Sequence, residues 1–191
     1  MEYSIIIVSC YLLGSIPFGL ILTRFFLKQN IRNIGSGNIG ATNVLRTGNK
    51  LIGYSTLILD ITKAIIPVIY IKLNYPDYVF ISSLSVFFGH VFPIWLKFKG
   101  GKGVATYVGI LFSIKIFYGL VFVGSWLIIF LITKYSSLSS IIASLVLPIY
   151  LSLFLKNDFI FFAIMFVLIL FTHRENVKRL KNNKESKTKI Y

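Results

Sequence analysis

Three short segments of the chain gather the polar and glycine residues that could do chemistry. The first, Gly35–Arg46, reads GSGNIGATNVLR. Its glycines let backbone N–H groups approach a ligand closely, successive N–H groups form a nest for an anion, and a guanidinium suits phosphate. We interpret it as a phosphate-binding loop, although a flexible loop with a lipid-contacting arginine is the alternative. Its candidate residues are Ser36, Gly37, Asn38, Asn43 and Arg46.

The second segment, Gly89–Thr106, reads GHVFPIWLKFKGGKGVAT. Gly100–Gly103 precedes a predicted helix, and a helix N-terminus attracts phosphate through its free N–H groups and its macrodipole. The spacing is not that of a Walker A loop. A tight turn with lysines on the inner side of a membrane is the alternative. The candidate residues are His90, Lys97, Gly100, Gly101, Lys102, Gly103 and Thr106.

The third segment, His173–Leu180, reads HRENVKRL and follows an apolar run directly. If the helix continues, His173 and Asn176 are three residues apart and share a face. Histidine can act as an acid, a base or a hydrogen-bond donor to phosphate near neutral pH. A basic tail lying on anionic lipid is the alternative.

Two charged residues, Asp60 and Lys63, lie inside an apolar run. Charges within a membrane are costly and often mark a site. A local ion pair that steadies a helix bundle explains them equally, and we assign them a structural role. The stretch Ser15–Gly19, SIPFG, breaks the first apolar run, either as a kink or as the opening of a cleft for an acyl chain.

The residue types that are scarce narrow the chemistry further. The chain has two histidines, six acidic residues and a single cysteine, Cys10. We therefore expect no zinc or magnesium site, no cofactor and no internal disulfide, and the sequence has no Gly-x-Ser-x-Gly nucleophile elbow. Such a site suits a substrate that arrives already activated and anionic.

The composition indicates that the elements that position these segments belong to a membrane protein. Of the 191 residues, 56% are hydrophobic and 14% are charged, and the mean hydropathy is +0.81. Soluble domains have roughly 25% charged residues. The composition excludes a disordered chain and an ordinary cytosolic enzyme. The net charge of +14 does not indicate nucleic-acid binding, because the chain contains long apolar runs without charges.

The apolar runs predict an all-α, polytopic membrane helix bundle of about seven transmembrane helices in a single domain, residues 1–191. The segment Val104–Thr133 would be about 45 Å long as one helix, which is too long for one crossing, so we divide it near Lys115–Tyr118. The expected spans are Tyr3–Thr23, Leu51–Ile71, Tyr78–Leu96, Val104–Ile116, Phe117–Thr133, Leu138–Leu155 and Phe159–Thr172.

The basic residues predict the orientation. With the N-terminus outside and the C-terminus in the cytoplasm, 16 of the 20 Lys and Arg residues fall on inner segments, in keeping with the positive-inside rule. Lys72, Lys115 and Lys156 are the exceptions on the outer side. The main inner segments are about residues 24–50, 97–103 and 173–191, so we expect the chemistry to face the cytoplasm.

The three segments, together with Leu13–Gly19, closely resemble the bacterial acyl-phosphate:glycerol-3-phosphate acyltransferase family, the membrane-bound PlsY enzymes. The resemblance implies transfer of a fatty acyl group from acyl phosphate to the 1-hydroxyl of glycerol 3-phosphate, an early step of phospholipid biosynthesis in the bacterial cytoplasmic membrane. The products are 1-acyl-glycerol 3-phosphate (lysophosphatidic acid) and phosphate. Neither CoA, acyl carrier protein nor a metal is implied.

The resemblance also implies roles for individual residues. The positions of Ser36 and Arg46 are essential in the family, and the second motif, Gly100–Thr106, is associated with glycerol 3-phosphate. The third motif contributes the positions of His173, Asn176 and Glu185, the last with a structural role. Where the family often has glycine, this chain has Asn183 before Glu185 and Ala64 after Lys63.

We therefore expect Arg46, Lys102 and the Gly100–Gly103 backbone to hold the two phosphates. Ser36 and Asn38 would position the acyl phosphate or polarise its carbonyl. His173, steadied by Asn176, would orient the attacking hydroxyl or take its proton. The substrate's own phosphate as base, and Ser36 as a covalent nucleophile, are the alternatives.

Two functions of other classes compete with this interpretation. A small transporter of phosphorylated metabolites would line a path with the same glycine and basic residues, but the outer loops are short and no internal repeat is visible. A non-catalytic scaffold on the lipid surface would use the basic tail, but it leaves Ser36, Asn38 and Asn43 without a role.

Overall fold

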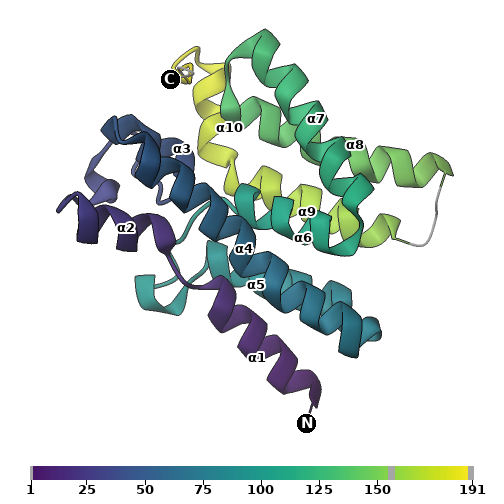
Figure 1. The fold of residues 1–191 in the computed structure, drawn as a ribbon. Coiled ribbons are helices and arrows are strands. Elements are labelled where there is room, and N and C mark those ends of the chain that lie inside the picture. The colour runs from purple at the N-terminus through teal and green to yellow at the C-terminus, as the bar shows by residue number, and fades with distance from the viewer. Residues whose placement is uncertain (1, 155–157, 189–191) are drawn as a thin grey trace. The chain divides into compact units, whose positions relative to one another are not determined.

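A computed structural model of the chain describes residues 2–154 and 158–188. Within them the regular secondary structure is helical throughout, as the composition predicts, and helices α1 to α10 follow one another along the chain (Figure 1). The chain divides into two compact units, Met1–Ile114 and Lys115–Tyr191. Leu155, Lys156 and the tail residues 189–191, which belong to the predicted spans and loops, lie outside the described residues.

The first unit has five longer helices connected by short helical turns. The longer helices are α1 (Glu2–Gly14), α2 (Phe18–Phe26), α4 (Lys50–Asn74), α5 (Val79–Val91) and α6 (Val104–Ile114). The short elements are η1 (Ile31–Asn33), α3 (Ala41–Val44), η2 (Leu45–Thr47), η3 (Pro76–Tyr78) and η4 (Ile94–Leu96).

The expected break in the first apolar run is present between α1 and α2, at residues 15–17. Pro17 has no backbone N–H to continue the helical hydrogen bonds. Ser15 lies at the break, and its hydroxyl accepts a hydrogen bond from the indole Nε1 of Trp95 at 2.7 Å. The break is therefore tied to the segment that follows α5.

The helices of the first unit approach one another closely, with α1 packed on α5 and α4 packed on α6. Glycine makes this possible at each contact. A Cβ added at Gly14 would collide with the backbone of Val86 in α5, and one added at Gly109 in α6 would collide with the carbonyl oxygen of Ile61 in α4. Small residues at helix contacts are typical of membrane bundles, where close packing replaces the hydrophobic effect.

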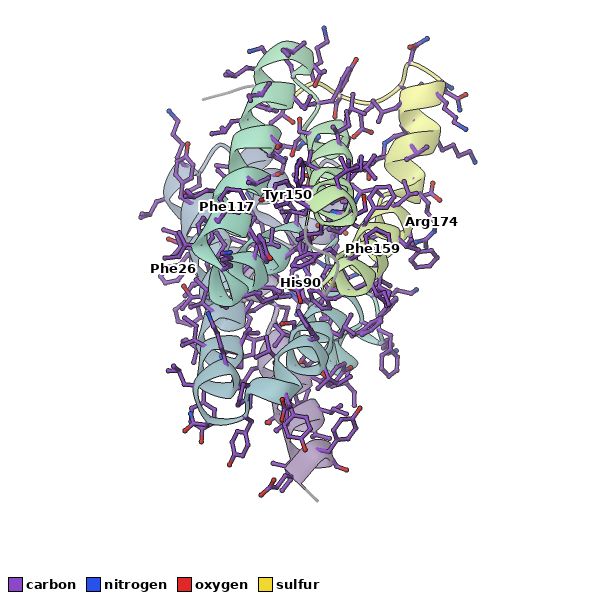
Figure 2. All side chains as sticks on the ribbon, turned by 90° about the vertical axis from the view of Figure 1, so that its right-hand side faces the viewer. Phe26, His90, Phe117, Tyr150, Phe159 and Arg174 are labelled. Atoms are coloured by element: carbon purple, nitrogen blue, oxygen red, sulfur yellow. The ribbon has the colours of Figure 1, made fainter. Side chains whose placement is uncertain are left out.

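The second unit contains α7 (Ile116–Thr133), α8 (Ser136–Phe154), α9 (Phe159–Thr172) and α10 (Arg174–Lys181). Helices α7 and α8 form an antiparallel pair, and α9 packs on α8 (Figure 1). Aromatic rings fill part of this packing, and Figure 2 shows Phe117 of α7 beside Tyr150 of α8, with ring centroids 5.7 Å apart. Lys115 has an extended backbone between α6 and α7, so the predicted division of Val104–Thr133 is confirmed.

Four of the seven predicted spans correspond to helical stretches that are long and apolar enough to cross a membrane, and a fifth corresponds to α9 with α10, which are bent by 61°. The other two coincide with α4 and α6. Helix α4 has 25 residues but buries two charged side chains. Helix α6 has 11 residues and is about 16 Å long, roughly half the hydrocarbon thickness of a bilayer. The four stretches are Glu2–Phe26, Pro76–Leu96, Ile116–Thr133 and Ser136–Phe154.

Candidate active site

The loop that follows α2 carries the first group of predicted site residues, and Asn43 holds it together. Asn43 is 3% exposed. Its amide Nδ2 donates to the carbonyl oxygens of Ile34 and Asn38 at 2.9 and 2.8 Å, and its Oδ1 accepts from the backbone N–H of Ser36 at 3.0 Å. The side chain of Asn43 therefore forms hydrogen bonds within the loop, whereas the sequence suggested a contact to substrate.

Ser36 and Arg46 come together because the residue beside them is glycine. Gly35 has a φ of +53°, a conformation that glycine adopts without steric cost. A Cβ at this position would lie 2.7 Å from Cδ and 3.0 Å from Nη1 of Arg46. The arginine side chain thus passes over the backbone next to Ser36, and both residues are exposed. A hydroxyl and a guanidinium therefore belong to neighbouring, exposed residues of this loop.

One of the two polar atoms of the Asn38 side-chain amide is already hydrogen-bonded. Its Oδ1 accepts a hydrogen bond from the backbone N–H of Gly40 at 2.9 Å, an Asx turn that leads into α3. The preceding residue, Gly37, has a φ of +70°. The amide NH₂ is then the group through which Asn38 can donate to a ligand.

The second predicted segment folds back onto the end of α5. The backbone N–H of Gly100 donates to the carbonyl oxygen of Val91 at 2.9 Å, and that of Gly101 donates to His90 at 3.1 Å. These two N–H groups therefore satisfy the last carbonyls of α5 and are not the phosphate donors that the sequence suggested. The guanidinium of Arg32 donates to the carbonyl oxygen of Lys99, which joins the loop after α2 to the second segment.

The first turn of α6 retains the properties expected of an anion site. Gly103, with a φ of +84°, leads into the helix, and the first N–H groups of a helix have no partner within it. Lys102 is half-buried at this end. Thr106, on the same turn, is 0% exposed, and its hydroxyl has no hydrogen-bond partner among the described residues. Lys97 is exposed, with a φ of +51°.

The two charges predicted within the membrane do form an ion pair. The ammonium of Lys63 lies 2.8 Å from Oδ1 of Asp60, and both side chains are 3% exposed. The sequence did not predict their third partner. Nδ1 of His90 lies 2.9 Å from Nζ of Lys63, and Figure 2 shows His90 among interior side chains.

In the second unit, His173 lies at the bend between α9 and α10 and is 2% exposed. Its Nδ1 lies 2.8 Å from the carbonyl oxygen of Ile169. A carbonyl oxygen only accepts, so Nδ1 carries the proton that is donated to it, and in a neutral ring with this tautomer Nε2 is the proton acceptor. This is the tautomer that a general base requires.

Asn176 lies three residues further along and is 4% exposed. Its Nδ2 donates to Oε1 of Glu185 at 2.6 Å, the same oxygen accepts from the hydroxyl of Ser137 at 2.7 Å, and Oε2 accepts from Nε of Arg179 at 2.6 Å. Burial raises the pKa of Glu185, but these hydrogen bonds and the arginine charge outweigh it, so the pKa lies below its ordinary value. Oδ1 of Asn176 has no partner among the described residues.

Ser137 was missed by the sequence analysis. It lies near the start of α8 and 48 residues before Glu185, and a serine-rich stretch, Ser136–Ser140, was the only signal. Asn183, which stands where the family often has glycine, has a φ of +54°. Asparagine tolerates this left-handed conformation better than most residues, so the departure is compatible with the turn that returns Glu185 to Asn176.

The predicted site residues therefore form two groups, one in each unit. In the first unit, Arg32 joins the loop that carries Ser36 and Arg46 to the segment that precedes α6. In the second unit, His173 lies three residues before Asn176, which is hydrogen-bonded to Glu185. Within residues 2–154 and 158–188, no three His, Cys, Asp or Glu side chains are grouped so as to hold a metal ion.

Comparison with known proteins gives a consistent result over the length of the chain. Residues 4–183 match the family model described as glycerol-3-phosphate acyltransferase. The glycerol-3-phosphate acyltransferase of Pelagibacter ubique (strain HTCC1062) is 73% identical over 191 residues, which is all of both chains. That of Brucella anthropi is 50% identical over 178 residues, which cover 93% of this chain and 89% of the relative.

The fold matches crystal structures of PlsY (YgiH), an integral membrane glycerol 3-phosphate acyltransferase. The glycerol 3-phosphate form has a TM-score of 0.89 at 35% identity and covers 98% of this chain and 96% of PlsY. The lysophosphatidic acid form has a TM-score of 0.87 at 34% identity, with 98% and 95% covered. This chain belongs to the glycerol-3-phosphate acyltransferase family and is an integral membrane acyltransferase.

Proposed function

We propose that this glycerol-3-phosphate acyltransferase takes its acyl group from a fatty acyl phosphate and transfers it directly to the 1-hydroxyl of glycerol 3-phosphate. The hydroxyl oxygen attacks the acyl carbonyl carbon, a new ester bond forms, and the bond from that carbon to the phosphate oxygen breaks. The products are 1-acyl-glycerol 3-phosphate (lysophosphatidic acid) and inorganic phosphate. An acyl phosphate is already activated, so neither CoA, acyl carrier protein, metal nor cofactor is required.

The observation that carries the proposal is the close approach of the Arg46 side chain to the backbone beside Ser36, which puts a cation and a hydroxyl on one loop of the first unit. Arg46 and Lys102, with the N-terminus of α6, would hold the two phosphates. Ser36 and the amide NH₂ of Asn38 would donate to the acyl phosphate, because Oδ1 of Asn38 is already engaged by Gly40. These groups stabilise the negative charge that develops on the carbonyl oxygen.

His173 would take the proton of the attacking hydroxyl. Its Nδ1 is fixed by Ile169, which directs the accepting Nε2 away from that carbonyl. Oδ1 of Asn176 is buried without a partner, and a buried acceptor of this kind gains from a ligand hydroxyl. Glu185 and Ser137 would hold Asn176 from the other side.

The crystal structures of PlsY support this assignment of substrate and product. One form contains glycerol 3-phosphate and the other lysophosphatidic acid, in a protein whose fold matches 98% of this chain. Residues 1–191 would then act as a single catalytic domain.

We further propose seven spans, with the N-terminus outside and a multi-pass location in the bacterial cytoplasmic membrane. Lysine and arginine gather on the segments 24–50, 97–103 and 173–191, and the positive-inside rule places these in the cytoplasm. Glycerol 3-phosphate would enter from the cytoplasm, and the acyl chain from the bilayer.

The test is donor specificity in lipid vesicles. The purified protein would receive glycerol 3-phosphate with palmitoyl phosphate, palmitoyl-CoA or palmitoyl-loaded acyl carrier protein, and lysophosphatidic acid would be measured by mass spectrometry. We expect product from palmitoyl phosphate alone. Product from either thioester donor at a comparable rate, or none from palmitoyl phosphate, would contradict the proposal.

A transporter of phosphorylated metabolites is tested in the same vesicles. Uptake of labelled glycerol 3-phosphate in the absence of any acyl donor would support transport, and its absence beside product formation would exclude it.

A further inference from the structure

The ammonium of Lys63 has three close polar neighbours inside the first unit. It lies 2.8 Å from Oδ1 of Asp60, 2.8 Å from the carbonyl oxygen of Ile16 and 2.9 Å from Nδ1 of His90. A lysine ammonium has three N–H groups, of which two face Ile16 and His90 at hydrogen-bonding distance, and its charge is paired with the carboxylate of Asp60. The three neighbours come from α4 itself, from the break between α1 and α2, and from the end of α5.

This arrangement fixes the protonation of His90. An ammonium only donates, so Nδ1 of His90 must accept and carries no proton. The carboxylate of Asp60 lies 3.8 Å from Nδ1, beyond hydrogen-bonding distance. The neutral ring therefore has its proton on Nε2. Lys63 thus sets both the tautomer and the orientation of the imidazole.

The other edge of the ring touches the glycine segment that precedes α6. A Cβ added at Gly101 would collide with Nε2 of His90. The backbone N–H of Gly101 donates to the carbonyl oxygen of His90 at 3.1 Å. His90 therefore contacts this glycine through both its backbone and its ring, one residue before Lys102.

We infer that Lys63 and His90 are positioning residues for the acceptor phosphate. Lys63 holds the ring of His90, the ring and backbone of His90 hold Gly101, and Gly101 sets where Lys102 and the first turn of α6 lie. Asp60 balances the buried positive charge, which would otherwise be costly within a membrane. The inference rests on the proposed role of Lys102 and α6 in binding glycerol 3-phosphate.

The effect of substitutions distinguishes a network of Asp60, Lys63 and His90 that only stabilises the helix bundle from one that positions a binding site. Loss of stabilisation alone lowers the melting temperature and the amount of folded enzyme but leaves the KM for each substrate unchanged. Loss of positioning raises the KM for glycerol 3-phosphate in the folded enzyme and leaves that for palmitoyl phosphate near its parent value.

The experiment compares Lys63→Met with Lys72→Met in the purified full-length enzyme in lipid vesicles. Lys72 is a matched control, because it lies on the same helix and its ammonium also bonds backbone oxygens, those of Ser113 and Ile114. We expect Lys63→Met to raise the KM for glycerol 3-phosphate by about tenfold, the loss expected for about one hydrogen bond. Lys72→Met should leave it within about twofold of the parent, a difference well below one hydrogen bond.

A second set of variants does not depend on an unpaired buried charge. Gly101→Ala should raise the same KM, because its Cβ meets the ring of His90. Once His90→Ala has removed the ring, adding Gly101→Ala should have no further effect. Non-additive effects of this kind show direct coupling between two positions.

An enzyme with Lys63→Met that is folded and has the parent KM for glycerol 3-phosphate would overturn the inference. Additive effects of Gly101→Ala and His90→Ala would overturn it as well, and they decide the matter if Lys63→Met does not fold. Failure of the proposed function is distinguishable, because the parent enzyme would then form no product in the same assay.

Discussion

Nδ2 of Asn176 donates to Oε1 of Glu185 at 2.6 Å, and this bond connects the third motif to the tail that follows it. Ser137 and Arg179 donate to the same carboxylate. Glu185 is thus the acceptor around which Asn176, Ser137 and Arg179 are arranged in the second unit. Its negative charge, and not only its shape, is needed to accept three hydrogen bonds at once.

The pH dependence of stability tests this assignment. The hydrogen bonds from Asn176, Ser137 and Arg179 lower the pKa of Glu185 against the opposing effect of burial. A carboxyl with a lowered pKa stabilises the folded state above its ordinary pKa, and this stabilisation is lost as the pH falls through the lowered value. We expect the melting temperature of the parent to fall more steeply with acidification than that of Glu185→Gln. Equal pH profiles would show that the charge of Glu185 does not stabilise the fold.

Gly35 and Gly48 form a matched pair for testing the Ser36–Arg46 loop. Both have positive φ, +53° and +85°, but a Cβ at Gly35 meets Arg46 and Asn43, whereas a Cβ at Gly48 meets nothing within 4 Å. Alanine at either position costs about 1–2 kcal/mol of backbone strain. Only Gly35→Ala also displaces the guanidinium, so we expect its kcat/KM to fall by at least about 100-fold, as for a misplaced substrate clamp.

The same assay supplies the control, because Gly48→Ala should carry the backbone strain alone, with a modestly lower melting temperature and most of the parent kcat/KM. If the two variants lose activity equally, the close approach of Arg46 to Gly35 has no catalytic consequence.

Replacing Thr106 is expected to preserve or raise the stability of the enzyme while weakening its binding of glycerol 3-phosphate. Its hydroxyl is fully buried and has no partner among the described residues, which costs free energy in the unliganded protein. Thr106→Val keeps the shape and removes the hydroxyl. We expect an equal or higher melting temperature, and a KM for glycerol 3-phosphate that rises by roughly five- to tenfold, the worth of about one hydrogen bond. A lower melting temperature with an unchanged KM would show that the hydroxyl serves the fold alone.

The helical architecture could be predicted from the sequence because it depends on local properties. The length of the apolar run Val104–Thr133 and the positive-inside rule predicted the division between α6 and α7, and the stretch Ser15–Gly19 predicted the break between α1 and α2. The candidate site residues of the inner segments, Ser36 to Arg46 and Gly100 to Thr106, could likewise be identified from sequence motifs.

The roles of particular side chains could not be predicted, because they depend on partners brought from elsewhere in the fold. Asparagine is a residue type that often binds ligands, yet the amide of Asn43 donates hydrogen bonds to carbonyl oxygens of its own loop. The N–H groups of Gly100 and Gly101 are used by the end of α5. Ser137 reaches Glu185 across 48 residues, a distance at which sequence spacing carries no information.

His173 should be the residue whose loss most affects the chemical step. Replacing a general base typically costs 10²–10⁴-fold in rate, so we expect His173→Gln to lower kcat by about that factor with little change in either KM. Arg174→Gln is the adjacent control, since Arg174 is exposed and its guanidinium lies 4.6 Å from the ring centroid of Phe171. A kcat for His173→Gln within about threefold of the parent, well short of a lost general base, would instead favour the phosphate of the substrate as base.

The most direct test of the account is whether phosphate release requires the acceptor. The purified enzyme in lipid vesicles is mixed rapidly with palmitoyl phosphate, with or without glycerol 3-phosphate, and phosphate is followed over the first turnover for the parent, Ser36→Ala and Arg46→Ala. Direct transfer predicts release only when glycerol 3-phosphate is present, and its collapse in Arg46→Ala. A burst of one phosphate per enzyme without the acceptor, lost in Ser36→Ala, would contradict direct transfer and identify an acyl-enzyme on Ser36.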